Sequence, residues 1–165
     1  MSKTVILNHT EIANKIRRIA YQVYEVNANE KEIIIAGIEK KGFELAKRIT
    51  TVLEDISTIK VSLCSVKVNK KSPLEPVVSS LKSSDYKNKS IVLVDDVLNS
   101  GTTLMYGVLH FLEVPLKQLK TVVLVDRNHK KYPIKVDFKG ISLSTSLQDS
   151  VDVVFSKKKD YAYLE

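Results

Sequence analysis

The sequence of 165 residues has no tryptophan, one cysteine, four prolines and five glycines. The single cysteine, Cys64, cannot form a disulfide within the chain, and its apolar neighbours predict a buried side chain rather than a nucleophile. No apolar run reaches the length of about 20 residues that a membrane-spanning helix needs, and the first residues lack the apolar core of a secretion signal. We therefore expect a cytoplasmic protein without a membrane partner.

The remaining composition is that of an ordinary globular protein, with 44% hydrophobic and 27% charged residues. This length fits one domain over residues 1–165, and no repeat or domain boundary interrupts it. Basic residues outnumber acidic ones by 26 to 19, which gives a formal net charge of +7. Such an excess favours anionic partners, either phosphorylated small molecules or nucleic acid, and does not choose between them.

The most informative stretch runs from residue 91 to residue 104. Its first four residues, 91–94, are apolar and predict a buried strand, and two adjacent carboxylates, Asp95 and Asp96, follow directly. A short loop of small and hydroxyl-bearing residues comes next: Asn99, Ser100, Gly101, Thr102 and Thr103. Apolar residues at helical spacing follow the loop: Leu104, Val108, Leu109 and Leu112.

A strand, a small-residue loop and a helix N-terminus together predict an anion site. The first N–H groups of a helix lack partners within it, and the helix dipole adds positive potential there. Gly101 would let the backbone approach a phosphate closely. The two aspartates would repel that phosphate unless they face vicinal hydroxyls or a shared Mg²⁺. A plain strand–helix turn with two solvated aspartates is the alternative.

A second strand, loop and helix follow the same plan earlier in the chain. Residues 33–36 are apolar, the loop after them contains Lys40, Lys41 and Gly42, and residues 43–53 have an apolar helical pattern. This loop is a second candidate anion site, and a solvated lysine pair is the alternative reading. A further amphipathic helix is predicted from Thr10 to about Tyr24, with Asn8 or Thr10 as its cap.

The order of elements predicts an α/β fold. Further strands are expected over residues 5–8, 59–66, 121–125, 136–141 and 151–155. Strands alternating with helices favour a parallel, doubly wound sheet of about five strands, with ligands at the carboxyl ends of the strands. The polar segment 67–90 is expected to be a long flexible loop, either a lid or a plain surface loop. The last thirty or so residues are expected to form a small hood over the site.

The pattern of residues 91–104 resembles the signature of type I phosphoribosyltransferases that binds phosphoribosyl diphosphate (PRPP). The resemblance implies that Asp95 and Asp96 are catalytic, hold the ribose hydroxyls, and contact Mg²⁺ through those hydroxyls or water. It implies that the loop from Asn99 to Thr103 binds the 5′-phosphate. It further implies that Lys40, Lys41 and Gly42 bind pyrophosphate. Family members often have an arginine or a Ser-Tyr pair in the flexible loop, where this chain has only lysines.

Residues 125–140 resemble the pyrimidine-operon attenuation regulators, which bind leader mRNA and have uracil phosphoribosyltransferase activity. This resemblance implies that Arg127 belongs to the base pocket and that uracil is the base. Enzymes for 6-oxopurines usually have an aspartate at the position of Asn99, and an asparagine cannot take up a proton at neutral pH. The expected reaction joins PRPP and uracil to give a nucleoside monophosphate and pyrophosphate.

Two other functions stay open from the sequence. One is a nucleotide-sensing regulator that binds RNA and has little catalysis, for which a basic face is offered by Arg17, Arg18, Arg127, Lys130, Lys131 and Lys135. The other is a purine phosphoribosyltransferase. A homodimer or higher homo-oligomer is expected, whereas the sequence does not fix which base is accepted.

Overall fold

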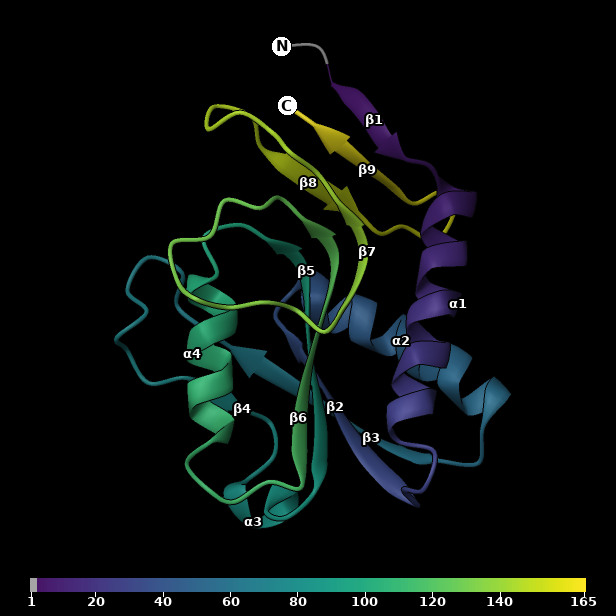
Figure 1. The fold of residues 1–165 in the computed structure, drawn as a ribbon, viewed down its shortest axis with the longest axis vertical. Coiled ribbons are helices and arrows are strands. Elements are labelled where there is room, and N and C mark those ends of the chain that lie inside the picture. The colour runs from purple at the N-terminus through teal and green to yellow at the C-terminus, as the bar shows by residue number, and fades with distance from the viewer. Residues whose placement is uncertain (1–2) are drawn as a thin grey trace.

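The centre of the computed structural model, which describes residues 3–165, is a six-stranded sheet. The strand order is β4-β3-β2-β5-β6-β7, and only the short edge strand β4 runs antiparallel to its neighbour (Figure 1). The strands are β2 (Glu32–Ile38), β3 (Lys60–Lys67), β4 (Val78–Ser79), β5 (Ser90–Leu98), β6 (Gln118–Asp126) and β7 (Phe138–Ser142). The predicted α/β fold with a parallel sheet is confirmed, and β4 brings the strands to six rather than about five.

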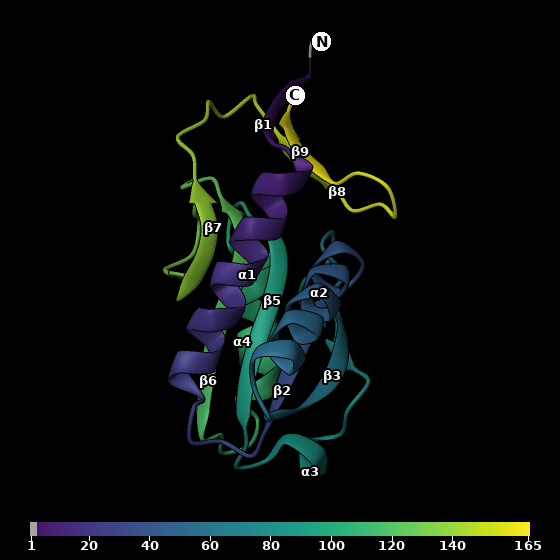
Figure 2. The same ribbon diagram turned by 90° about the vertical axis from the view of Figure 1, so that its right-hand side faces the viewer.

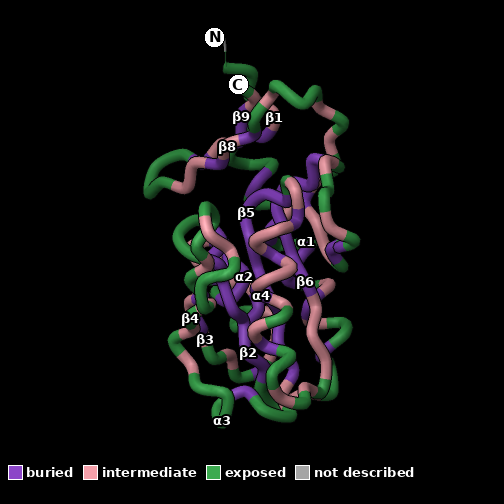
Figure 3. The backbone as a smooth tube through the Cα atoms, turned by 90° about the vertical axis from the view of Figure 1, so that its left-hand side faces the viewer, coloured by how far each residue is buried: buried purple, intermediate pink, exposed green. Residues whose placement is uncertain are grey.

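Helices cover both faces of this sheet. Helices α1 (His9–Val26) and α2 (Lys41–Ile56) lie on one face, as Figure 2 shows, and α4 (Thr102–Phe111) and the short α3 (Ser83–Tyr86) belong to the other side. Successive side chains of a strand point to opposite faces. Ile33 and Ile35 of β2 therefore pack under α1 and α2, while Ile34 joins the core under α4. This double cover explains why the central strands are almost wholly buried (Figure 3) and rich in apolar residues.

Helix α1 starts with a reciprocal cap. The Asn8 side chain accepts a hydrogen bond from the Glu11 N–H at 3.0 Å, and the Glu11 carboxylate accepts one from the Asn8 N–H at 2.8 Å. Two otherwise unpartnered donors are thereby satisfied. Of the two predicted candidates, Asn8 rather than Thr10 is the cap. The buried stripe of α1 contains Ile12, Ile16, Ile19, Ala20 and Val23, as its spacing predicted.

Helix α4 differs from the prediction in its apolar face. Leu104 and Phe111 are buried, but Leu109 is 62% and Leu112 57% exposed. The inward face is formed instead around Gly107, whose close approach brings α4 onto Leu93. Leu112 is the C-cap, where the chain leaves the helix, so it cannot continue the stripe. Leu109 and Leu112, although they share the helical spacing noted in the sequence, therefore do not belong to the buried face.

A small antiparallel sheet, here called the hood, lies beyond the carboxyl ends of the main strands. It consists of β1 (Thr4–Leu7), β9 (Tyr161–Leu164) and β8 (Val151–Val154), with β9 in the middle (Figure 1). Val153 and Ala162 of the hood are fully buried in the core shared with α1 and α2. The predicted C-terminal hood is present, and the N-terminal strand completes it.

The segment 67–90 is not one long loop. Strand β4 pairs with β3 through Val66 and Ser79, and α3 buries Tyr86 against Phe111 at a ring distance of 5.0 Å. The irregular part is therefore residues 68–77, and the expectation of a single uninterrupted loop is wrong. Cys64 is buried, as predicted. Within residues 3–165, no helix is both long and apolar enough to span a membrane.

Candidate functional site

The site lies at the carboxyl ends of β2 and β5 and is built around the 99–103 loop that joins β5 to α4. Gly101 has a φ of +84°, and a Cβ there would come within 2.5 Å of Ile134 Cγ2. Only glycine adopts this backbone without strain and fits this space. The Ser100 carbonyl accepts hydrogen bonds from the N–H groups of Lys131 at 2.7 Å and Tyr132 at 3.2 Å. The loop is thus fixed in shape by the segment behind it.

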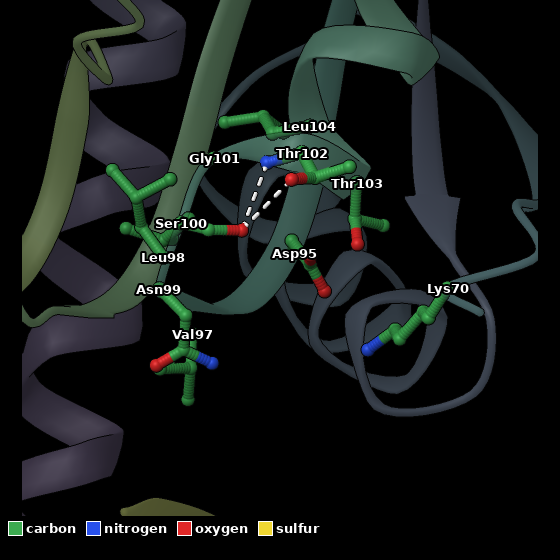
Figure 4. A pocket seen from close by; sticks show the side chains of 11 residues that line it. Lys70, Asp95, Val97, Leu98, Asn99, Ser100, Gly101, Thr102, Thr103 and Leu104 are labelled. Carbon is green, nitrogen blue, oxygen red and sulfur yellow. Dashed lines mark hydrogen bonds between the residues drawn. The ribbon is translucent and has the colours of Figure 1, made fainter. Parts of the chain in front are cut away.

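The 99–103 loop lines the first cavity, with a volume of about 230 Å³. The hydroxyls of Ser100 and Thr102 are 2.9 Å apart, and the Thr102 N–H donates to the Ser100 hydroxyl at 3.3 Å (Figure 4). The first turn of α4 adds N–H groups that lack acceptors within the helix and adds the positive end of the helix dipole. These donors and this dipole suit an anion with several oxygens, such as a phosphate.

The two adjacent carboxylates lie side by side near the end of β5, which continues past them to Leu98. A Cβ on Gly42, at the start of α2, would lie 3.2 Å from an Asp95 carboxylate oxygen, so this carboxylate also lies beside α2. Asp95 lines the first cavity and Asp96 lines a second one beside it, of about 330 Å³. The two cavities share Lys70, Val97 and Asn99. A ligand that filled both cavities would therefore lie beside both carboxylates.

Burial dominates the electrostatics of Asp95, which is only 5% exposed. Burial raises the pKa of the Asp95 carboxyl well above its usual range, the neighbouring Asp96 raises it further, and the Lys70 ammonium partly opposes both. One Asp95 oxygen also accepts the Asp96 N–H at 2.9 Å. A cation or a ligand hydroxyl beside the Asp95 carboxylate would therefore stabilise its charged form.

The second cavity is built at the start of α2. Glu39, Lys40, Lys41, Asp96 and Asp152 line it together with the shared residues. A Cβ on Gly42 would lie 2.8 Å from the Val94 carbonyl oxygen and 3.0 Å from Asp95 Cα, so a glycine is required for this contact between α2 and β5. The peptide bond between Glu39 and Lys40 is cis. The structure thus brings Lys40, Lys41 and Gly42 beside the two aspartates.

Lys41 connects this cavity to the hood. Its ammonium forms an ion pair with Asp152 of β8, and the Tyr163 hydroxyl donates to the other Asp152 oxygen at 2.8 Å. Desolvation of Asp152 is outweighed by these hydrogen bonds from Lys41 and Tyr163, so the pKa of its carboxyl is lowered. Sequence reasoning missed Asp152. Its only signal there is a carboxylate within an otherwise apolar strand.

Arg127 lies behind Asn99. Within residues 3–165, Arg127 is not among the residues that line either cavity. It is 9% exposed, and its guanidinium donates to Asn99 Oδ1 at 2.8 Å and to Thr145 Oγ1 at 3.2 Å. It also donates to the carbonyls of Ser146 and Asp149 in the segment that leads to the hood. Direct contact between Arg127 and a base stays a prediction.

Lys70 comes to the site from the irregular segment 68–77. It lines both cavities and points toward Asp95 in Figure 4. The Asn69 side chain holds the turn, because its oxygen accepts the N–H groups of Lys71 and Ser72 and its nitrogen donates to Glu75 at 2.7 Å. The sequence indicated lysines in this segment but not which of them reaches the site.

A metal ion would need oxygen atoms from a ligand to bind here. Within residues 3–165, no group of three or more His, Cys, Asp or Glu side chains is arranged to hold a metal. Mg²⁺ commonly binds through one or two carboxylates together with substrate phosphates and water. Asp95 and Asp96 therefore fit a Mg²⁺ that arrives with a phosphorylated substrate.

The comparison with protein families settles which family has this site. The model of the phosphoribosyl transferase domain matches residues 2–156. The chain belongs to this family of type I phosphoribosyltransferases. It is 30% identical to the bifunctional protein PyrR of Clostridium novyi, over 94% of this chain and 92% of that protein. It is 32% identical to the bifunctional protein PyrR of Bacillus pumilus, over 92% and 89% of the two chains.

Solved structures agree on the fold. A hypoxanthine phosphoribosyltransferase of Trypanosoma cruzi, in complex with IMP, has a TM-score of 0.76 at 16% identity and covers 86% of this chain and 72% of its own. A hypoxanthine phosphoribosyltransferase of Staphylococcus aureus has a TM-score of 0.74 at 20% identity, with 90% and 80% covered. These similarities confirm the type I phosphoribosyltransferase fold predicted from residues 91–104.

Proposed function

We propose that the protein transfers the 5-phosphoribosyl group of PRPP to uracil and releases pyrophosphate. The observation that supports this most is the pair of adjoining cavities, one lined by the 99–103 loop and one by Lys40 and Lys41, with Asp95 and Asp96 between them. PRPP has a phosphate at each end of one ribose, so its shape suits this arrangement. The resemblance to PyrR proteins supports a pyrimidine base.

In the proposed complex, the 99–103 loop binds the 5′-phosphate. The donors are the hydroxyls of Ser100, Thr102 and Thr103 and the N–H groups at the start of α4. Lys40, Lys41 and the backbone around Gly42 bind the pyrophosphate group. Lys41 would have to exchange its ion pair with Asp152 for the pyrophosphate, which is the more highly charged partner.

The proposed reaction is a displacement at C1 of the ribose. The bond from C1 to pyrophosphate oxygen breaks as the bond to the base nitrogen forms, and positive charge develops on the ribose, as in glycosyl transfer. Asp95 and Asp96 orient the ribose hydroxyls and stabilise that charge, while Lys40 and Lys41 stabilise the leaving group. When Mg²⁺ is bound through Asp95 and Asp96 by way of hydroxyls or water, it supplies further positive charge to the pyrophosphate.

The test is pyrophosphate release from PRPP and Mg²⁺ with uracil, hypoxanthine, guanine and adenine offered one at a time. We expect release with uracil alone. The double variant Asp95→Asn, Asp96→Asn should lose nearly all turnover while keeping its fold. Release with a purine alone would establish the purine alternative and overturn the uracil assignment, and unchanged turnover of the double variant would overturn the mechanism.

A second candidate function is regulation through RNA. Lys130, Lys131 and Lys135 are exposed beside the site, and Arg17 is exposed on α1. A basic surface of this kind attracts a phosphate backbone, and the attraction weakens steeply with salt. Binding of a pyrimidine-leader RNA that depends on added nucleotide, with no turnover of any base, would favour this function over catalysis.

We also propose that the protein is cytoplasmic and forms a homodimer or higher homo-oligomer. The single cysteine, Cys64, is buried, which fits a reducing compartment. Sedimentation velocity over a range of protein concentrations measures the oligomeric state directly, and a monomer at all concentrations would contradict this proposal.

A further inference from the structure

Asn99 occupies the junction of the two cavities. Its side chain is exposed and lines both of them. If PRPP spans these cavities as proposed above, its C1 atom and the incoming base lie near this junction. An asparagine amide has two different ends: the oxygen accepts hydrogen bonds and the nitrogen donates them. Which end faces the ligand therefore decides which bases the site favours.

Arg127 fixes the direction of this amide. Arg127 Nη1 lies 2.8 Å from Asn99 Oδ1, and a guanidinium has donors but no acceptor, so the amide oxygen must face it. The Asn99 nitrogen consequently points to the side on which Lys70 lies, as Figure 4 shows. The opposite orientation would set two donors against each other.

Arg127 is itself firmly held. Its guanidinium is anchored by Thr145 Oγ1 and by the carbonyls of Ser146 and Asp149. Its own N–H donates to the Leu98 carbonyl, next to Asn99 in the chain, at 3.1 Å. A buried arginine with its donors committed in this way loses little further freedom when a ligand binds. It can therefore impose one orientation on Asn99.

We propose that Arg127 is a positioning residue that makes Asn99 a fixed hydrogen-bond donor toward the base. The site then favours bases with a carbonyl oxygen next to the ring nitrogen that becomes bonded to ribose, as in 2-oxopyrimidines. This inference rests on the proposed function, and it gives that function a physical reason for accepting uracil.

The same donor assists the chemistry. As the N1–C1 bond forms and the bond to pyrophosphate breaks, the base loses its N1 proton to water and the electron pair of the broken bond goes to the pyrophosphate oxygen. Negative charge on the base is shared with the neighbouring carbonyl oxygen, where the Asn99 nitrogen can stabilise it.

The test compares how tightly UMP and ribose 5-phosphate bind, measured by calorimetry. The two ligands share the phosphate and the ribose, so their affinity ratio isolates the base. Asn99→Asp replaces the donor with an acceptor and should lower this ratio by about tenfold, the effect of one lost hydrogen bond to a carbonyl together with the repulsion that replaces it. Equal weakening of both ligands would overturn the inference, as would a wild-type protein that gains no affinity from the base.

Variants of Arg127 test the positioning role. Arg127→Met frees the Asn99 amide to turn and should lower the same ratio about threefold, whereas Arg127→Lys can still donate to Asn99 Oδ1 and should restore part of it. Thr51→Val alters an exposed threonine of α2 that lines neither cavity, and should leave the ratio unchanged. Circular dichroism confirms that each variant is folded.

The decisive control is Arg127→Met in an Asn99→Ala background. If Arg127 acts through Asn99, it has no further effect on the ratio there. A further fall would mean that Arg127 acts on the base by another route and would overturn the inference. Failure of the proposed transferase is a separate result, because it appears as the absence of pyrophosphate release with every base.

Discussion

At the scale of single residues, the buried carboxyl group of Asp95 lowers the stability of the folded protein. Burial raises the pKa of the folded-state carboxyl. From about pH 4 upward, Asp95 therefore keeps its proton in the folded protein over a pH range in which it has lost the proton in the unfolded chain. The free energy of unfolding falls as the pH rises through this range, and the cost persists at neutral pH.

Asp95→Asn is therefore expected to stabilise the protein. At pH 7 the free energy of unfolding should rise by about 1 kcal/mol or more, since each pKa unit corresponds to about 1.4 kcal/mol. The asparagine oxygen can still accept the Asp96 N–H. Urea unfolding at several pH values measures the effect, and Asp55→Asn on the exposed face of α2 is the matched control. A less stable Asp95→Asn variant at pH 7 would contradict the account.

Sequence reasoning found most of the residues that line the two cavities and missed how they act together. Asp95, Asp96 and the 99–103 loop were predicted because strand, acids and small residues follow one another directly in the chain. Asp152 and the contact between Arg127 and Asn99 bring together residues far apart in the sequence. No local pattern records such pairs, so they could be known only from the fold.

At the scale of elements, the segment 68–77 is the part of the site with the least regular structure. Lys70 is its contribution to both cavities. Lys70→Ala should weaken the binding of PRPP about tenfold, which corresponds to roughly 1.4 kcal/mol for one charge-assisted contact. Calorimetry with PRPP and Mg²⁺ measures this loss. Lys71→Ala removes the same charge one residue away, outside both linings, and an equal loss in that variant would exclude a specific role for Lys70.

Helix α1 offers a test of how its first turn is specified. Asn8→Ala removes the acceptor for the Glu11 N–H and should lower the free energy of unfolding by about 1 kcal/mol. Thr10→Ala is the matched control, because Thr10 is exposed and was the other candidate cap. Thermal or urea unfolding compares the two. A larger loss for Thr10→Ala would mean that the cap observed at Asn8 does not stabilise the helix.

The elements that the sequence predicted correctly are those with long periodic patterns, such as α1, α2 and the buried strands. The short elements β4 and α3 were missed because two and four residues are too few to show a period. The face of α4 was partly wrong for a different reason. Gly107 adds no apolar side chain to the pattern, yet it is the point of closest packing onto Leu93.

At the scale of the whole molecule, the hood is fastened to the main body through Asp160. This carboxylate is 2% exposed and accepts hydrogen bonds from Arg48 of α2 and from the Ser156 N–H at 2.9 Å. His9 at the start of α1 lies 3.3 Å from the same carboxylate and accepts the Asp160 N–H at 3.1 Å. One buried residue thus connects the hood to both helices of one face.

Arg48→Ala should loosen this connection. Removing the arginine leaves the Asp160 charge buried without its main partner, so the free energy of unfolding should fall by about 2 kcal/mol. Relative to the wild-type protein, the variant should show faster amide hydrogen exchange in β8 and β9, and a smaller change in β5. Arg17→Ala is the matched control, since Arg17 is exposed and contacts Tyr21 on its own helix. Unchanged exchange in β8 and β9 would contradict this role for Arg48.

The pairing of β1 with β9 also constrains how the protein is made. Residues 4–7 leave the ribosome long before their strand partner, residues 161–164. During translation, β1 stays unpaired until β9 has been synthesised, while the strands of the main sheet are already available to pair. Because Asp152 and Tyr163 of the hood hold Lys41, a nascent chain that does not yet include these two residues would have the 99–103 loop in place before Lys41 is fixed. The cavity on the side of α2 is therefore the last part of the site to mature.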